Sequence, residues 1–195
     1  MWTAGHCVFS PGIGFHSNFS FAPARHNGVN PFGTWTVRDA ITLNGWANGL
    51  NEYDSGGLYM DRGGPAPGNF LVEQLGALGI AFDQPRGQHW EARGYPAAPP
   101  FDGEHHHVCA ATWVRDDQPT GGPGDPLTVG IGCDMTGGSS GGPWMLDLVA
   151  DTAPGLFING NVSYGYVGVP DQYYSPYFTA GQQAIYDWMN GNPVP

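Results

Sequence analysis

Three short segments of the chain carry residue types that could perform acyl transfer together. His6 lies in the sequence Thr-Ala-Gly-His-Cys, Asp54 stands just before a glycine-rich apolar stretch, and Ser140 is surrounded by glycines in Gly-Gly-Ser-Ser-Gly-Gly-Pro. Acyl transfer requires a hydroxyl nucleophile, an imidazole that takes its proton, a carboxylate that orients the imidazole, and backbone N–H groups that bind the oxyanion. The order His6, Asp54, Ser140 supplies the three side chains.

Each of these residues also has a simpler explanation. A histidine is often structural, an aspartate often stands in a turn, and a Gly-Ser run is often a linker. The linker explanation is weakened because Pro-Trp-Met-Leu follows at residues 143–146 and is typical of a buried strand. Two alternatives stay open: Asp39 is another acid in strand-like surroundings, and Ser139 is a neighbouring hydroxyl, although only Ser140 has Gly-Gly-Pro directly after it.

The triplet His105–His107 suggests a zinc site as a further alternative. Adjacent residues on a strand point to opposite faces of the sheet, and no second cluster of ligand residues is evident. We therefore expect neither a metal ion nor another cofactor.

The composition argues against several classes of protein. The 195 residues include 6 Lys+Arg against 17 Asp+Glu, which gives a formal net charge of -11 at pH 7. Nucleic-acid binders and anionic-membrane binders need a basic face, so neither partner is expected. No run approaches the ~18 apolar residues of a membrane-spanning helix.

The elements that must position these residues are mostly strands. The 32 glycines and 18 prolines favour short strands joined by turns over long helices. The predicted strands are Gly33–Val37, Ala40–Leu43, Gly56–Met60, Ile80–Phe82, Trp90–Tyr95, His107–Trp113, Leu127–Gly130, Gly142–Leu146, Gly155–Ser163 and Gly165–Val167.

One helix is expected, at the C-terminal end of the sequence. Thr179 and Gln182 have the spacing of a capping box, and Gly191 and Pro193 end the helical pattern. The apolar positions expected to share its buried face are Ala184, Ile185, Trp188 and Met189.

Four segments together resemble the trypsin-like (chymotrypsin-fold) serine peptidases, in particular their secreted bacterial members. Residues 3–7 are similar to the family's Thr-Ala-Ala-His-Cys, and residues 138–143 are similar to its Gly-Asp-Ser-Gly-Gly-Pro. Residues 53–58 resemble its acid-bearing strand, and residues 162–165 resemble its Val-Ser-Trp-Gly strand. The resemblance spans nearly the whole chain, with the motifs in the family's order.

The resemblance implies a role for each matching residue. Ser140 would be the nucleophile, His6 the general base and Asp54 the carboxylate that orients the imidazole, while the N–H groups of Gly138 and Ser140 would form the oxyanion hole. Activity is then expected to rise around neutrality, where an unperturbed imidazole loses its proton. The residues implied in substrate binding are Asp134, Ser163, Tyr164 and Gly165.

Residue preference stays open. Asp134 lies six residues before Ser140, where relatives that cleave after basic residues carry an acid, so it could select Lys or Arg. It could equally follow a disulfide cysteine on a loop wall without touching substrate. Val162 stands where glutamate-specific relatives carry a histidine, which argues against an acidic preference.

The resemblance also implies the fold. We expect an all-β protein with two six-stranded antiparallel β-barrels, the first incomplete, and a C-terminal α-helix. The expected domains are 1–75 for the remainder of the first barrel, 76–178 for the second barrel and 179–190 for the helix. The family carries several strands before its histidine motif, and here only Met1 and Trp2 precede Thr3. An N-terminally truncated sequence is therefore expected, with a signal peptide upstream.

The cysteines fit the same expectation. Cys7 usually pairs with a cysteine further upstream, so Cys109 and Cys133 are predicted to form a disulfide. A disulfide together with scarce lysine suggests a secreted protein. We expect a monomer that acts on protein or peptide substrates.

Two alternatives from other functional classes remain. The chain could be a catalytically inactive binding or scaffold module that keeps the protease fold. It could also be a carbohydrate-binding β-domain, for which the aromatic residues are Trp35, Trp46, Trp90, Tyr173 and Tyr174.

Overall fold

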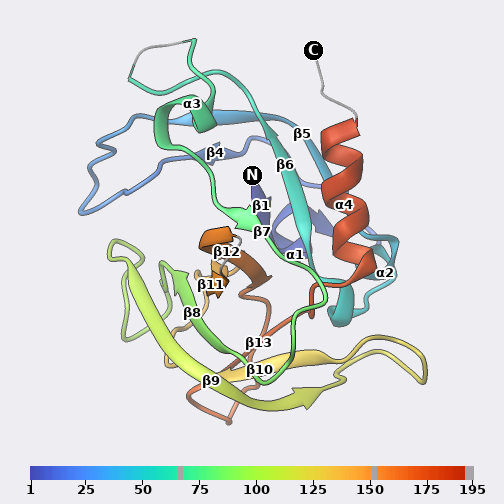
Figure 1. The fold of residues 1–195 in the computed structure, drawn as a ribbon. Coiled ribbons are helices and arrows are strands. Elements are labelled where there is room, and N and C mark those ends of the chain that lie inside the picture. Colours follow the sequence, from blue (N-terminus) through green and yellow to red (C-terminus); the bar gives the residue numbers. More distant parts are fainter. Residues whose placement is uncertain (66–67, 151–152, 192–195) are drawn as a thin grey trace.

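The computed structural model describes residues 1–65, 68–150 and 153–191, and most of its elements are β-strands (Figure 1). The elements before residue 76 are β1 (Trp2–Thr3), α1 (Gly5–Val8), β2 (Phe9–Ser10), β3 (Gly14–Phe15), β4 (Ser20–Phe21), β5 (Trp35–Thr42), α2 (Asn44–Ala47), η1 (Asn51–Tyr53), β6 (Gly56–Met60) and α3 (Leu71–Leu75). Those after it are β7 (Gly79–Ile80), β8 (His89–Gly94), β9 (His107–Asp117), β10 (Thr128–Gly132), β11 (Pro143–Ala150), β12 (Ala153–Asn161), β13 (Gln172–Ser175) and α4 (Ala180–Gly191).

The first sheet contains β1, β6, β5 and β4 in that order, all antiparallel. The strand predicted at Gly56–Met60 is confirmed as β6. The separate strands predicted at Gly33–Val37 and Ala40–Leu43 are wrong, because β5 runs through both. A register shift between Val37 and Asp39 absorbs the extra residue as a bulge, so the chain keeps pairing with β6 instead of turning.

The second sheet contains β13, β10, β9, β8, β11, β12 and β7 in that order. β7 pairs in parallel with β12, and the other pairs are antiparallel. Its core is centred on Trp90 and Trp144, which are fully buried with ring centroids 5.8 Å apart. The expected all-β body with a C-terminal helix is thereby confirmed.

The strand predicted at Gly165–Val167 is wrong. Tyr164 makes an isolated bridge to Tyr174, and the chain then turns, with the N–H of Val169 donating to the carbonyl of Tyr166 at 3.1 Å. Gly168 has a φ of 84°, a left-handed conformation that ends strand pairing at this point.

The predicted C-terminal helix is confirmed as α4. The N–H of Thr179 donates to Gln182 Oε1 at 3.1 Å, as expected of a capping residue. The helix lies along β6 (Figure 1), where Gly57 leaves room for the sulfur of Met189. Pro193, expected beyond the helix end, lies outside the described residues.

The buried face of α4 differs from the expected one. Ala184 and Trp188 are exposed, whereas Gln182 and Ile185 are buried. Because Met189 fills the space above Gly57, the helix packs through positions 182, 185 and 189. Ile185 and Met189 therefore lie on the packed face as expected, and Gln182 takes the place expected for Ala184. Trp188 lies at the edge of this face, with its ring 6.0 Å from that of Tyr59 in β6.

For brevity, residues 1–60, which carry the first sheet, are called the first lobe, and residues 79–178, which carry the second sheet, are called the second lobe. Figure 1 shows the two lobes on opposite sides of the molecule, with α4 returning from the second to pack on the first. None of the helices in the described part of the chain combines the length and apolar character needed to span a bilayer.

Candidate active site

Asp54 lies between η1 and β6 and is almost completely buried, with 2% of its surface exposed. Its Oδ1 accepts the backbone N–H of His6 at 2.7 Å. Its Oδ2 lies 2.7 Å from His6 Nδ1 and accepts the hydroxyl of Ser163 at 2.5 Å. Both carboxylate oxygens are therefore bound, one of them by groups from both lobes.

His6 lies in the single-turn helix α1, directly after the strand that pairs with β6. Its imidazole is one-third exposed, and its edge faces the Trp46 ring at 6.0 Å between centroids. Burial lowers the pKa of His6, but the hydrogen bond to Asp54 and the neighbouring Cys7 outweigh it and raise the pKa to about 10. Because Nδ1 is held by Asp54, Nε2 is the nitrogen available to another group.

Ser140 lies in a turn that depends on glycine. Gly138 has a φ of 106°, and an added Cβ would lie 2.7 Å from Ala97 Cβ. Gly141 has a φ of 78°, and an added Cβ would overlap Thr3 Oγ1. The Ser140 turn therefore packs against the backbone that leads into His6.

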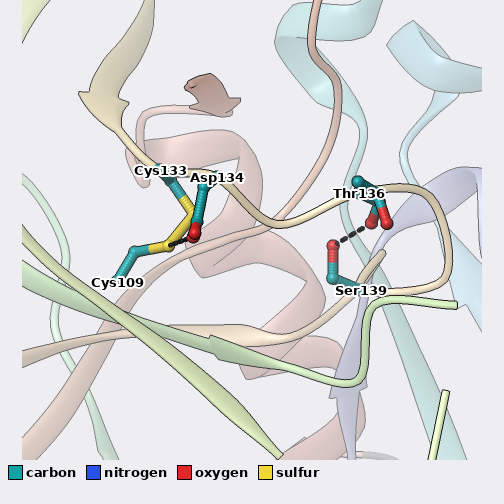
Figure 2. The surroundings of a disulfide bond; sticks show 5 residues. All are labelled: Cys109, Cys133, Asp134, Thr136 and Ser139. Atoms are coloured by element: carbon teal, nitrogen blue, oxygen red, sulfur yellow. Dashed lines mark hydrogen bonds between the residues drawn. A yellow bond between two sulfur atoms is a disulfide. The ribbon is translucent and has the colours of Figure 1, made fainter. Parts of the chain in front are cut away.

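The Ser140 turn is held by hydrogen bonds within the second lobe. The hydroxyl of the buried Ser139 donates to the carbonyl of Thr136 at 2.8 Å (Figure 2). The N–H of Gly141 donates to the carbonyl of Val162 at 2.9 Å, and the N–H of Gly142 to that of Ser139 at 3.0 Å. Ser139 thus stabilises the turn.

The remaining N–H groups of the turn are unused. Within the described ranges, the N–H groups of Gly138 and Ser140 donate to no backbone or side-chain acceptor. Over the same ranges, no hydrogen bond joins the Ser140 hydroxyl to His6. Ser140 also borders a mainly apolar cavity of about 1250 Å³ that extends between β6, α3 and the glycine turn.

The segment from Ser163 to Gly165 belongs to the second lobe and reaches the site at Asp54. The N–H of Ser163 donates to the carbonyl of Tyr174 at 3.0 Å, and the Tyr164 ring stacks on the Tyr174 ring with centroids 4.8 Å apart. At Gly165, an added Cβ would lie 3.0 Å from the carbonyl oxygen of Gln172. The segment therefore lies beside β13, adjacent to the carboxylate that Ser163 binds.

The predicted Cys109–Cys133 disulfide is confirmed, with the two Cα atoms 5.3 Å apart. Figure 2 shows the side chain of Asp134 lying against this disulfide, and its Oδ1 is 3.6 Å from Cys109 Sγ. Asp134 is exposed to solvent. Cys7 is a free thiol.

The other candidates from the sequence lie elsewhere. Asp39 binds the adjacent N–H of Ala40 at 2.8 Å. The rings of His105, His106 and His107 face three different aromatic neighbours: His26, Tyr95 and Phe101. Over the described part of the chain, the one cluster compact enough for a metal ion consists of the disulfide and Asp134, and its sulfurs are bonded to each other.

Two buried residues beside Asp54 were missed by sequence reasoning. Asn161 donates from Nδ2 to the carbonyl of Asp54 at 3.0 Å and accepts the hydroxyl of Ser55 at 3.0 Å. Glu52, two residues before Asp54, is fully buried and binds the 118–126 loop of the second lobe. The only sequence signal was a second acid beside Asp54.

No protein-family model matches the chain. Among solved structures, the protease Anisep from Arthrobacter nicotinovorans is similar at 36% identity and a TM-score of 0.81, over 96% of this chain and 81% of that one. A thermostable serine protease, AL20, from an extremophilic microorganism is similar at 39% identity and a TM-score of 0.81, over 97% of this chain and 83% of that one.

Two further similarities are weaker. A Glu endopeptidase, solved in complex with MPD, is 17% identical with a TM-score of 0.71, over 100% of this chain and 80% of that one, which shows a likeness of fold alone. An extracellular metalloprotease from Bacillus subtilis (strain 168) is 30% identical over 100 residues, or 51% of this chain. The chain spans only about a third of the length of that curated relative, with 31% of it covered.

Proposed function

Because the chain belongs to the chymotrypsin-fold serine peptidases, we propose that it is an endopeptidase that cleaves proteins or peptides with Ser140, His6 and Asp54. An acyl-enzyme intermediate divides the reaction into two steps. The observation that carries the proposal is the 2.7 Å pairing of His6 Nδ1 with the buried Asp54, together with a glycine turn in which the N–H groups of Gly138 and Ser140 have no acceptor among the described residues.

In the first step, Ser140 Oγ attacks the carbonyl carbon of the scissile bond and gives its proton to His6 Nε2. The tetrahedral intermediate then collapses, its C–N bond breaks, and His6 donates the proton to the departing amine. In the second step, His6 takes a proton from water, whose oxygen attacks the acyl carbon. The bond from this carbon to Ser140 Oγ then breaks, His6 returns the proton to Oγ, and the acid product leaves. Substrate binding brings Ser140 and His6 together, since catalytic hydrogen bonds are often long in free enzymes.

The oxyanion of each tetrahedral intermediate is bound by the N–H groups of Gly138 and Ser140. Such donors are held in place before charge develops, and each contributes roughly 3 kcal/mol at the transition state. The left-handed conformation of Gly138 and the hydrogen bonds of Ser139 support this assignment.

Substrate backbone is proposed to add as a strand beside Ser163–Gly165, with Tyr164 as part of the surface it contacts. The extracellular setting proposed for this activity is supported by the Cys109–Cys133 disulfide, since disulfides persist in oxidising environments. The name of the Bacillus relative points in the same direction.

Asp134 is proposed to favour Lys or Arg in the residue before the scissile bond. Its carboxylate is exposed six residues before Ser140, but it also lies 3.6 Å from Cys109 Sγ, as a residue on the loop wall beside the disulfide would. Substrate preference distinguishes the two roles. For Asp134→Asn we expect the ratio of kcat/KM values for matched Arg and Leu peptide substrates to fall. An unchanged ratio would leave Asp134 as a surface neighbour of the disulfide.

The proposal is tested by labelling with an organofluorophosphonate probe, followed by peptide mapping. The purified protein should be labelled at Ser140, and Ser140→Ala should lose the label together with turnover on the order of 10⁶-fold. Ser17→Ala, at an exposed serine away from the site, is the matched control and should keep full labelling.

A folded protein that takes no label and cleaves no peptide would refute the peptidase and leave the inactive binding module. Labelling mapped to Ser139 would also contradict the assignment, because the Ser139 hydroxyl is buried and bound to Thr136.

A further inference from the structure

The five consecutive residues from Asn51 to Ser55 all bind the second lobe. The N–H of Asn51 donates to Thr120 Oγ1 at 2.7 Å, and the hydroxyl of Tyr53 donates to Asp125 Oδ1 at 3.0 Å. Asp54 and Ser55 bind Ser163 and Asn161. The proposed triad acid therefore belongs to the first lobe in sequence but is anchored to the second.

Glu52 makes the densest of these contacts. Its Oε1 accepts the N–H groups of Thr120 and Gly121 at 3.1 and 2.8 Å, and its Oε2 accepts the hydroxyl of Thr120 at 2.9 Å. The residue is fully buried. A buried carboxylate is costly unless it is hydrogen-bonded, and these bonds hold it against one short piece of loop backbone.

The loop approaches Glu52 closely because residue 121 is glycine. An added Cβ at Gly121 would lie 3.0 Å from Glu52 Cδ and 2.9 Å from Asp125 Cβ. The fit between carboxylate and loop therefore leaves no room for a side chain at this position.

The ends of the same loop bind the segment proposed to hold substrate. Asp117, just before the loop, accepts the hydroxyl of Tyr164 at 2.9 Å, and Thr128, just after it, lies 2.7 Å from the same hydroxyl through Oγ1. The 118–126 loop thus contacts the Asn51–Ser55 segment, and the two residues that flank the loop contact Tyr164.

We infer that Glu52 is a positioning residue: by binding the 118–126 loop, it holds Asp54 in place against His6 and links that pair to the substrate-binding segment. The inference rests on the proposed triad. Removing the carboxylate leaves the N–H groups of Thr120 and Gly121 without acceptors inside the interface. The Asn51–Ser55 segment then loosens, and Asp54 no longer orients His6.

The test compares Glu52→Ala with Glu52→Gln, whose amide oxygen can still accept the two N–H groups. Glu104→Ala is the control for a carboxylate that bridges the lobes elsewhere: the half-buried Glu104 accepts Arg25 Nη2 at 3.0 Å and the N–H of Gly28 at 2.6 Å. We expect Glu52→Ala to lower kcat on the order of 10²-fold with little change in KM, as misplacement of catalytic groups does. Glu52→Gln should recover most of kcat, and Glu104→Ala should leave it unchanged.

A second readout does not depend on the reactivity of Ser140. In the Ser140→Ala background, NMR reports the proton between His6 Nδ1 and Asp54 and the pKa of the imidazole. In Glu52→Ala this proton signal should broaden, and the pKa of His6 should fall toward that of a free imidazole. Thr120→Val keeps both N–H donors to Glu52 and removes the hydroxyl, which binds Glu52 Oε2 and accepts the N–H of Asn51. It should move both readouts in the same direction by less, and it serves if Glu52→Ala does not fold.

If the folded Glu52 and Thr120 variants keep the Nδ1 proton signal and the His6 pKa of the parent protein, the positioning role is overturned, whatever their stability. Equal losses of kcat in Glu52→Ala and Glu104→Ala would overturn it as well, because loosening anywhere between the lobes would then suffice. If the unmodified protein takes no phosphonate label, the proposed function fails, and the NMR comparison still decides whether Glu52 positions Asp54.

Discussion

The carboxylate of Asp54 decides which nitrogen of His6 can act. Oδ2 binds the ring at Nδ1 and Oδ1 accepts the backbone N–H of the same residue, so Asp54 holds both the ring and the backbone of His6. The proton of the neutral imidazole then stays on Nδ1, and the lone pair of Nε2 is left for the Ser140 hydroxyl. Ser163 adds a donor from the other lobe, so the position of Asp54 depends on both sheets.

The contacts of His6 change the pH dependence expected of the activity. A free imidazole titrates near ~6.5, whereas the contacts of His6 raise its pKa to about 10. The general base works only when neutral, so activity should rise with pH as His6 loses its proton, and the acid limb should lie well above neutrality.

The profile of kcat/KM against pH for the free enzyme tests this prediction, with NMR titration of His6 alongside it. Asp54→Asn should move the imidazole titration to lower pH, because the raising charge is removed. A wild-type acid limb near the value of a free imidazole would contradict the prediction.

Among the elements, the loop from Cys133 to Gly142 has the strictest requirements. Its shape depends on left-handed Gly138 and Gly141 and on the Ser139 hydroxyl. The disulfide ties its first residue to β9. Elsewhere, local sequence patterns predicted the ends of the strands less well. At Val37–Asp39 a bulge lets β5 continue where two separate strands were expected.

Removing this disulfide should lower the stability of the protein. Replacing Cys109 and Cys133 together by Ser opens a loop with a sequence separation of 24, and the chain-entropy effect predicts a loss of about 3 kcal/mol in the free energy of unfolding. Denaturant unfolding of the double variant and of the oxidised protein measures the difference. Coincident transitions would show that the disulfide does not stabilise the fold.

In the molecule as a whole, the candidate site lies where two sheets meet. His6 and Asp54 come from the first lobe and Ser140 and Ser163 from the second, and polar contacts join the lobes around Asp54. Asn161 and the 118–126 loop bind the segment around Asp54. The comparison of Glu52→Ala with Glu104→Ala therefore tests whether the relative position of the two lobes controls the geometry of the site.

The sequence by itself determined the β class, the capped C-terminal helix and the Cys109–Cys133 pair. It also determined which imidazole, carboxylate and hydroxyl to examine, because motif order and turn chemistry are local properties. Only the tertiary structure decided that Gln182, and not Ala184, is buried beneath α4, and that Glu52 and Asn161 bind across the lobes. Those contacts join residues 68 to 107 positions apart, and the identity of a partner at such separation depends on how the sheets pack, which no local pattern encodes.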